Sequence, residues 1–502
     1  VGAGDKYIGG NLMTVGEVNK HAYHNHVIKG KRKEFVEFCA QNPNNNFEKF
    51  RDFYGPSVMT VSAFYKDLLK YDEPIRVGVI DFPSLVHAYL NVEDKLLSLG
   101  FDEDCGPEWD PYEIYCDLNK KAAMGALYQG SKNDWLKEIT PKEFIEQVQE
   151  SYRLLGHGVV GIWSGSLKAE LRTKAKIAEG KTRVFTGAPI DVLLAGKVLV
   201  DKFNKHFYTQ HLKGPWSVGI NKFNRGWDKL ARYFNHDWKF IDCDGSRFDS
   251  SLSPILFQMV CHMRERFGHF DWAETNALRN LYAQIVYTPI LTIDGNIVKK
   301  HKGNNSGQPS TVVDNTLILM LVVEYCKSWH FKQSGVKMEF KYMCNGDDLI
   351  INAPDREISI IQSTFKNLLK ECGLNYDFDD LHDSIEDVEY MSHHFVLREG
   401  FYIPKLSKER LVAILEWERS DELFRTRSAS NAAYIESFGY DDIHWEIERF
   451  AAYWANLKGV KNVLMSEDHV RKLYLDENFE LTDEIVQTLS PASFEFGYVE
   501  LQ

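Results

Sequence analysis

The fold is decided by residues 340–352, which read Phe-Lys-Tyr-Met-Cys-Asn-Gly-Asp-Asp-Leu-Ile-Ile-Asn. Asn345-Gly346 lies between two apolar runs, the strongest short-range signal of a β-hairpin. The pattern therefore predicts a strand, a tight turn and a second strand, with Asp347 and Asp348 adjacent at the tip. Aspartate also favours turns for its own hydrogen bonding, so the pair by itself does not establish a functional site.

Periodicity upstream of the hairpin predicts a strand and two helices. Residues 238–243 are a short strand candidate, and apolar residues recur at helical spacing within 253–267. A second long helix is predicted over 310–329. Strand, helix, helix and hairpin is the order of a split β-α-β unit, so we expect an α+β fold.

A second pair of aspartates, Asp244 and Asp249, lies where the first predicted strand ends. Phosphoryl transfer by two metals needs carboxylates from separate strands, converging on ions about 3.5–4 Å apart. Mg²⁺ takes few protein carboxylates and completes its shell with waters and phosphates. One aspartate from this strand and one from the hairpin would supply that set. Asp242 shares the strand face of Asp244, as either an auxiliary carboxylate or a structural support.

Residues 302–311 form a loop containing Gly and Ser that opens the second long helix. Such a loop lets the backbone approach a phosphate or a ribose closely, although ordinary turns share this composition. Asn315 lies one helical turn beyond Thr311, on the same face. Both side chains are suited to hydrogen-bond a sugar hydroxyl.

The net charge of −13 argues against nucleic-acid binding, but the charges are unevenly distributed. Residues 168–183 contain many more basic than acidic side chains, whereas residues 376–400 are strongly acidic. An acidic exterior with a basic channel suits a protein that passes RNA without adhering to it elsewhere. The basic run is either an exposed helix or a clamp for a triphosphate, to which Arg offers bidentate contacts.

Length and composition exclude several other classes. With 502 residues, 44% of them hydrophobic, the chain is expected to form about two to four packed lobes. No apolar run approaches the roughly 20 residues of a membrane-spanning helix, and the eight cysteines form no CxxC pair. A basic cluster at 29–33 is either a nuclear-import signal or a solvated loop.

Taken in chain order, the basic run, the paired aspartates, the Gly-Ser loop and the hairpin resemble motifs F, A, B and C of viral RNA-dependent RNA polymerases. Further runs are similar to the nuclear inclusion body b polymerases of the potyvirus family. These runs are Gly187-Ala188-Pro189-Ile190-Asp191, Ile285-Val286-Tyr287-Thr288-Pro289, Gly303 to Asn315 and Tyr390-Met391-Ser392-His393. The similarity covers nearly the whole chain and implies a closed right hand of fingers, palm and thumb.

This resemblance implies a division of the chain into five parts. They are 1–200 for an N-terminal extension and fingers, 201–280 for palm with motif A, 281–304 for a fingers insertion, 305–400 for palm with motifs B to E, and 401–502 for the thumb.

The resemblance also implies residue roles. Asp244 and Asp347 would ligate two Mg²⁺ ions, or Mn²⁺ in their place, with help from Asp348. Residues that would bind the incoming nucleotide are Lys168, Arg172, Lys174 and Arg183 at its triphosphate, and Asp249, Ser306, Thr311 and Asn315 at its ribose, with Gly307 beside them. Residues that would contact template or product RNA are Gly125, Gly130, Lys405 and Arg410.

The chain departs from the family pattern after motif C, where related enzymes often carry a lysine as the general acid for pyrophosphate. No Lys or Arg lies between Lys370 and Arg398, and His382 is the one histidine between Lys370 and His393. A histidine titrates near neutrality and is chemically able to donate this proton. The alternative is a surface histidine in an acidic segment.

The last residues, Tyr498 to Gln502, end in Leu-Gln, which resembles the product of a viral cysteine protease that cuts after Gln. The chain would then be one segment of a polyprotein. The resemblance further implies template and product RNA, ribonucleoside triphosphates, a genome-linked protein primer (VPg), the viral protease and host replication factors as partners. It implies viral replication sites in the host cytoplasm as the location, with the nucleus as a second one.

Two other function classes match part of the pattern. A reverse transcriptase or DNA polymerase also uses two carboxylates, but it usually excludes the ribose 2′-hydroxyl with a bulky side chain, where Asp249 and Asn315 offer polar groups. An RNA-binding protein without enzymatic activity would not need Asp244, Asp347 and Asp348 together. The sequence therefore favours RNA-directed RNA synthesis.

Overall fold

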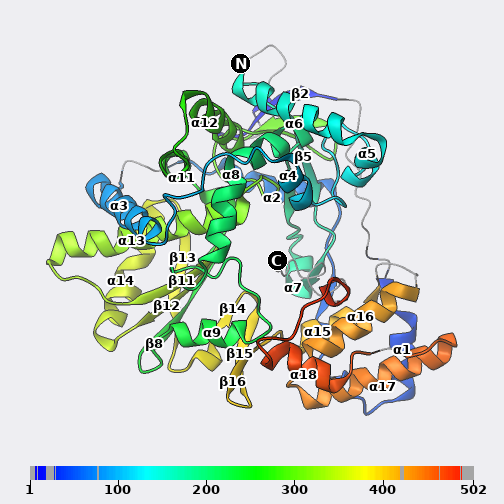
Figure 1. The fold of residues 1–502 in the computed structure, drawn as a ribbon. Coiled ribbons are helices and arrows are strands. Elements are labelled where there is room, and N and C mark those ends of the chain that lie inside the picture. Colours follow the sequence, from blue (N-terminus) through cyan, green and yellow to red (C-terminus); the bar gives the residue numbers. More distant parts are fainter. Residues whose placement is uncertain are drawn as a thin grey trace.

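The computed structural model describes residues 6–7, 10–18, 28, 30–75, 79–418, 423–462, 464–486 and 488. A four-stranded antiparallel sheet of order β11-β12-β8-β13 lies in the left half of Figure 1. Its strands are β8 (Lys239–Ser246), β11 (Lys341–Asn345), β12 (Asp348–Ala353) and β13 (Asn375–His382). The fold mixes helix with antiparallel sheet, as the α+β prediction requires, and the hairpin pairs beside the earlier strand.

The hairpin differs from its prediction by one residue. Asn345 pairs with Asp348, so the two turn residues are Gly346 and Asp347 rather than Asn345 and Gly346. Gly346 has φ +58°, a left-handed conformation that costs a residue without Cβ little. The turn therefore presents the Asp347 side chain at the tip.

Helices cover the central sheet, and the two predicted ones are confirmed. They are α11 (Pro254–Gly268) and α13 (Thr311–Ser334), with α3 (Phe82–Ser98), α8 (Ile190–Thr209) and α14 (Asp355–Glu371) beside them. Helix α13 lies against β11, α3, α11 and α14, and α14 lies against β13. The apolar stretch in α13 is buried on all sides, as a helix without an amphipathic pattern requires.

A six-stranded sheet of order β1-β2-β10-β9-β5-β7 lies in the upper part of Figure 1. Its strands are β1 (Lys6–Tyr7), β2 (Met13–Glu17), β5 (Trp163–Leu167), β7 (Val184–Gly187), β9 (Pro289–Leu291) and β10 (Asn296–Lys299). The helices in this part are α2 (Val61–Leu68), α4 (Pro111–Asp117), α5 (Lys132–Glu138), α6 (Pro141–Gly156) and α12 (Trp272–Val286). This part holds the segments before and between the central strands.

Smaller elements connect the upper part to the C-terminal helices. They are α9 (Gly226–Tyr233), the three-stranded sheet of β14 (Glu389–Tyr390), β15 (His393–Arg398) and β16 (Phe401–Lys405), the pair of β4 (Tyr54–Pro56) with β6 (Leu171–Thr173), and α7 (Lys174–Ala178). Helix α9 packs against β16.

The C-terminal helices form their own hydrophobic core at the lower right of Figure 1. They are α15 (Lys408–Glu416), α16 (Leu423–Glu436), α17 (Asp441–Lys458) and α18 (Glu467–Leu475). Helix α1 (Lys33–Gln41) belongs to the same core, because the ring of Phe35 lies 5.7 Å from that of Phe450. The N-terminal segment therefore packs with helices that follow it by some four hundred positions.

The basic cluster predicted at 29–33 is partly buried. Arg32 is 3% exposed and donates to the Leu415 carbonyl at 2.8 Å and to Thr426 at 2.6 Å. Lys31 pairs with Asp52, and residue 29 lies outside the described residues, as do 498–502 with their Leu-Gln end. An arginine used to join two segments is not a solvated loop residue.

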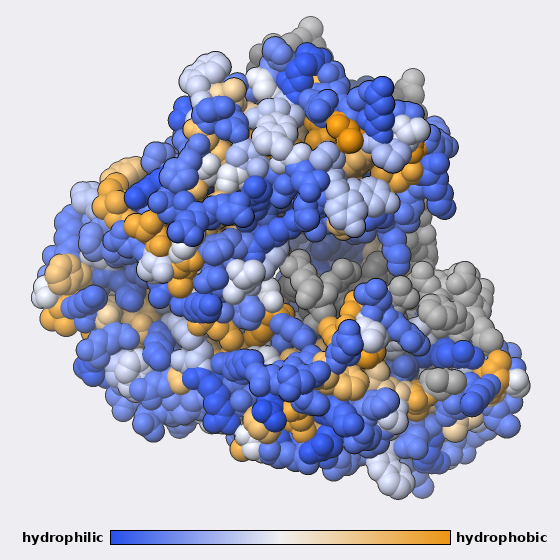
Figure 2. All heavy atoms as spheres, in the orientation of Figure 1, coloured by the Kyte–Doolittle hydropathy of each residue, from blue (hydrophilic) through white to orange (hydrophobic). Residues whose placement is uncertain are grey.

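The molecular surface is predominantly hydrophilic on the face that Figure 2 shows, with separate hydrophobic patches. Among the described residues, the helices are all too short or too polar to cross a bilayer.

Candidate active site

The paired aspartates of the hairpin and Asp244 lie beside one another at one end of the central sheet. Strand β12 pairs with β8 so that Leu349 lies opposite Cys243. Asp348 directly precedes Leu349 and Asp244 directly follows Cys243, so the antiparallel register makes these two aspartates neighbours. With Asp347 in the turn, the structure brings together the three carboxylates that the sequence singled out.

The hairpin tip is held by neighbouring elements. The Gly346 N–H donates to the Thr316 hydroxyl of α13 at 2.8 Å, and the Asn345 amide donates to the Ser217 hydroxyl at 3.0 Å. The buried Tyr376 hydroxyl donates to the carbonyl of Asp347. These bonds fix the Asp347 backbone on both sides of the turn, so its side chain has a defined position.

A cavity of about 420 Å³ opens in front of the tip. It collects side chains from the hairpin, the segment after β8, the loop before α13 and the basic run. Of the predicted site residues, those that line it are Lys168, Arg183, Asp249, Ser306, Asn315, Asp347 and Asp348. The structure thus gathers candidates that are far apart in the chain around one space.

Burial and neighbouring negative charges dominate the surroundings of the carboxylates at the hairpin tip, although the charge of Arg183 acts on Asp347 in the opposite sense. Reduced hydration and the negative charge of Asp249 raise the pKa of Asp347 to about 6. Burial, then the charges of Asp347 and Asp242, raise the pKa of Asp348 well above its usual value. Asp244 contributes to both shifts. Like charges this close oppose each other's ionisation, so the group would be stabilised by a cation.

Asp249 and Asn315 form a hydrogen-bonded pair on another wall of the cavity. The Asn315 amide donates to Asp249 at 2.9 Å and accepts from the Asn304 amide at 2.8 Å. Burial raises the pKa of Asp249, and the bond from Asn315 opposes that shift. Ser306 lines the same cavity while its hydroxyl accepts from the Thr186 N–H at 3.1 Å. Three polar groups are thus placed where a sugar could reach them.

Thr311 and Gly307, predicted beside the ribose, do not line this cavity. The Thr311 hydroxyl donates back to the carbonyls of Asn305 at 2.8 Å and Ser306 at 3.0 Å. A Cβ added at Gly307 would come within 2.8 Å of the Gly187 Cα. In this structure both residues hold the loop in place beside β7, and their contacts with a nucleotide stay a prediction.

The basic run supplies two residues to the cavity and leaves two outside. Lys168 and Arg183 line it, and Arg183 is anchored by Glu170, with Nε 2.6 Å from Oε1. Arg172 lies 3.7 Å from Glu170 and does not line the cavity, and Lys174 is exposed at the start of α7. Burial and the neighbouring Arg183 lower the pKa of Lys168, as expected of a cation facing other cations.

Several lining residues were missed from the sequence. Lys70 lines the cavity, paired with Asp67 at 2.7 Å, and no motif surrounds it. Arg247 also lines it and could have been found, because it is the one basic residue between Asp244 and Asp249. Ser392 reaches it from a run that had been noted without a role.

His382 lies away from the reacting end of the sheet. It ends β13 opposite Phe240, four residues before Asp244, which places it about 13 Å along the strand from that aspartate. Its Nε2 is 4.0 Å from Asp242, whose carboxylate accepts the Glu389 N–H at 3.0 Å. Asp242 therefore has the structural role. The assignment of His382 as general acid is corrected, because His382 lies at the surface of an acidic segment, the alternative given for it.

Replacing His382 by Leu is accordingly expected to leave the single-turnover rate of nucleotide incorporation and its pH profile unchanged within about twofold. Loss of a general acid costs about 10²–10⁴-fold. Quench-flow incorporation measured between pH 6 and 9 tests this. A large fall in rate with a flattened pH profile would restore the catalytic role.

Lys405, predicted to face product RNA, is buried instead. It is 0% exposed, and its Nζ donates to the Glu436 carbonyl at 2.7 Å and to the Tyr474 hydroxyl at 3.2 Å. A buried lysine with these partners joins β16 to the C-terminal helices and cannot reach RNA. Arg410, in the first turn of α15, is half-buried, with its guanidinium over the ring of Tyr54.

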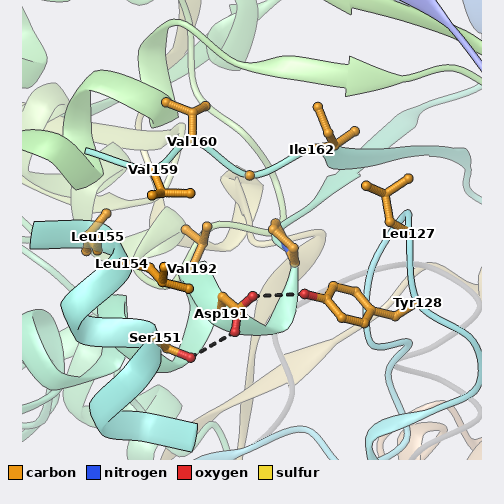
Figure 3. Close-up of a pocket in the computed structure, with 12 residues that line it drawn as sticks. Leu127, Tyr128, Ser151, Leu154, Leu155, Val159, Val160, Ile162, Asp191 and Val192 are labelled. Atoms are coloured by element: carbon orange, nitrogen blue, oxygen red, sulfur yellow. Dashed lines mark hydrogen bonds between the residues drawn. The ribbon is translucent and has the colours of Figure 1, made fainter. Parts of the chain in front are cut away.

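Gly125 and Gly130, predicted on the template path, bound a loop on the upper part of the molecule. Tyr128 in this loop donates to Asp191 at 2.8 Å, and Ser151 donates to the same carboxylate at 2.9 Å (Figure 3). The loop is thereby fastened to the first turn of α8, beside an apolar cavity of about 180 Å³. None of the residues of this loop lines the larger cavity.

The donor set of the larger cavity suits a divalent cation that brings its own water and phosphate ligands. Within the part of the chain that the structure describes, no three His, Cys, Asp or Glu side chains are arranged as a complete metal cage. Magnesium is usually held by one or two carboxylates together with substrate phosphates. The raised pKa values of Asp347 and Asp348, caused by burial and by neighbouring carboxylates, agree with that mode.

Comparison with known proteins identifies the family. Residues 30–455 match the family model described as viral RNA-dependent RNA polymerase. The chain is 58% identical over 95% of its length to the genome polyprotein of sweet potato mild mottle virus, and 45% and 41% identical over 96% and 97% of its length to those of Triticum mosaic virus and soybean mosaic virus strain N. It spans 14–16% of these polyproteins. The resemblance inferred from the motifs is thus confirmed, and the chain belongs to the viral RNA-dependent RNA polymerases, in the group found within potyvirid genome polyproteins.

Proposed function

We propose that this chain extends an RNA strand on an RNA template by nucleotidyl transfer that uses two divalent ions, Mg²⁺ or Mn²⁺. The observation that carries the proposal is the single cavity with Asp347 and Asp348 on one wall and Lys168 and Arg183 on another. Carboxylates that can hold cations thereby share one cavity with basic side chains that can bind phosphate. A nucleoside triphosphate with its metals satisfies both.

The acidic and the basic residues of the site would have different roles. Asp244 and Asp347 would hold the metals, and the bound ions would stabilise the attacking and leaving oxygens. Lys168 and Arg183 would bind the phosphate oxygens, with Arg183 kept in position by Glu170. Because these charged groups are already positioned around the cavity, they could stabilise the charge of the transition state with little movement of the protein.

The palm, fingers and thumb of the proposed right-hand fold can be assigned to elements of the structure. The central sheet with α11, α13 and α14 would be the palm, the six-stranded sheet and its helices the fingers, and α15 to α18 the thumb. Helix α1 packs in the core of those C-terminal helices, so the proposed thumb includes residues from the N-terminal segment. The closed form of the hand is supported by the family resemblance.

The wider biological role is proposed from the relatives. Their genome polyproteins support a setting in which the chain is released by a viral protease and works beside other viral proteins. Uridylylation of a VPg primer, host replication factors, and a location at cytoplasmic replication sites and in the nucleus belong to the same proposal.

Primer extension on a homopolymeric RNA template with ribonucleotides and Mg²⁺ tests the activity. Template-dependent RNA synthesis that stops in EDTA is the expected result. Synthesis that prefers deoxynucleotides would favour a reverse transcriptase, and RNA binding without incorporation would favour a binding protein.

Metal binding has a readout that does not depend on activity. Addition of Mg²⁺ is expected to raise the Tm of the chain by about 2–5 °C, because a cation relieves the repulsion between Asp347 and Asp348 and binds the folded state alone. The Asp347→Asn variant is expected to lose most of that shift, and Asp379→Asn, at an exposed position of β13, to keep it. Differential scanning calorimetry measures both. An equal shift in Asp347→Asn would contradict the metal assignment.

A further inference from the structure

A second cavity of about 340 Å³ lies behind the segment that follows β8. It is bounded by the end of α14, the start of α11 and the loop before α13, and its volume is within the range of small-ligand sites, roughly 300–1,000 Å³. Residues that line it include Glu73, Ser253, Lys302, Lys370, Glu371 and Asn375. None of these was assigned to nucleotide binding above.

Two buried polar side chains in this cavity lack partners. Lys302 is 4% exposed and lines the cavity, and the charges of Glu73 and Asp72 attract its ammonium group without a hydrogen bond or close ion pair to a described residue. Ser253 is also 4% exposed, and its hydroxyl is without a hydrogen bond among the described residues. A buried hydroxyl left unpaired is costly, so Ser253 points to a ligand in this cavity. Lys302 places a positive charge beside the same space.

The charges around the cavity favour an anion. Lys370, at the end of α14, is exposed and brings a second ammonium group. Ser253 is the residue before the first turn of α11, whose backbone N–H groups attract negative charge. Of the two carboxylates present, Glu73 is paired with Arg247 at 2.9 Å, and Glu371 accepts from the Tyr325 hydroxyl at 2.8 Å. Among the residues that line the cavity, two lysines thus face one carboxylate without a cationic partner. Asp72, which also acts on Lys302, accepts from the Asn11 N–H at 2.6 Å.

The second cavity adjoins the first. Arg247 lines the first cavity, and its partner Glu73 lines the second; Ser250 and Ser251 likewise line one each. An anion held by Lys302 would therefore lie next to the place where a triphosphate reacts. In that position the anion most consistent with two lysines is a chain of phosphates.

We propose that Lys302, Ser253 and Lys370 form a second polyphosphate site, which takes either pyrophosphate or the triphosphate tail of a nucleotide. The choice of a polyphosphate rests on the proposed polymerase function, whereas the anion site itself rests on the unpaired side chains.

Binding of pyrophosphate by isothermal titration calorimetry in EDTA tests the site in the full chain. The parent is expected to bind two equivalents. Lys302→Met is expected to weaken one of them by about tenfold or more, and Ser253→Ala by about threefold. Lys337 is exposed and lines neither cavity. Lys337→Met is therefore the matched control and is expected to bind as the parent does. Two undiminished equivalents in Lys302→Met would overturn the proposal.

Lys168→Met separates this inference from the proposed function. It is expected to lose the other equivalent and to keep the one that depends on Lys302. If Lys168→Met binds both equivalents and elongates normally, the function assigned to the first cavity fails while the second site stands.

The Tm of the variant reports on its folding, and competition binding identifies the ligand. Methionine in place of an unpaired buried lysine removes a desolvation cost, so Lys302→Met is expected to melt at or above the parent Tm; a clearly lower Tm would mean that the ammonium is already satisfied, and would overturn the site. Competition by ATP identifies a nucleotide tail, and binding of pyrophosphate alone identifies the leaving product. Orthophosphate binding as tight as that of pyrophosphate would contradict a polyphosphate site.

Discussion

Replacing Asp347 or Asp244 by Asn is expected to reduce the rate of RNA elongation by about 10³-fold or more. The substitution keeps the shape of each side chain but removes the negative charge that holds a cation. Asp347 lies at a turn fixed by Thr316 and Tyr376, so the amide of the variant is expected to occupy the same position without the charge. Single-turnover incorporation into a primed RNA template measures the effect.

The fold and the RNA-binding surface are expected to survive these substitutions. Burial raises the pKa of Asp348 and reduced hydration that of Asp347, so an amide at the tip relieves repulsion and is not expected to lower the Tm. Asp379→Asn, at an exposed position on the adjacent strand, serves as the control and should elongate as the parent does. Elongation within tenfold of the parent by Asp347→Asn or Asp244→Asn would contradict the proposal that these aspartates hold the metal ions.

Replacing Asp249 or Asn315 by Ala is expected to lower the preference for ATP over dATP by about 10–100-fold. A site that hydrogen-bonds a hydroxyl rejects the analogue without it, because the polar groups of the site are then left unpaired. Asn315 donates to Asp249, so loss of either residue releases the other. Values of kcat/KM for the two nucleotides opposite uridine give the ratio.

The pair should also behave as a unit. Because each residue positions the other, the double variant is expected to lose little more discrimination than either single variant. Asp237→Ala, at an exposed position before β8, is the control. Parental discrimination in both single variants would mean that these residues only shape the cavity.

Sequence reasoning succeeded where the signal was local. The hairpin at 340–352 and the two helices have complete periodic patterns within one short window, and each appears within a few residues of its predicted bounds. The neighbouring positions of Asp244 and Asp348 depend on pairing across about a hundred residues. We predicted that pairing from the order of the motifs along the chain, because no local pattern indicates it.

The failures arise where tertiary packing overrides residue type. A lysine is expected at the surface, but Lys405 is buried because a carbonyl and a tyrosine hydroxyl satisfy its ammonium group. His382 was judged by residue type, whereas the register of β13 decides its place. That strand contains a bulge between Asp377 and Asp380, which no composition reveals. Lys70 lies in no motif and enters the cavity only through the path of the chain.

The packing of α1 against α17 has a consequence for synthesis on the ribosome. Phe35 emerges early, but its partner Phe450 follows about 400 residues later, which at roughly 5–20 residues per second is a delay of about 20–80 s. During that interval the apolar face of the first helix can contact Phe47, which follows it directly, but it lacks its partners from the C-terminal helices. The C-terminal core can therefore close only after translation has passed α17.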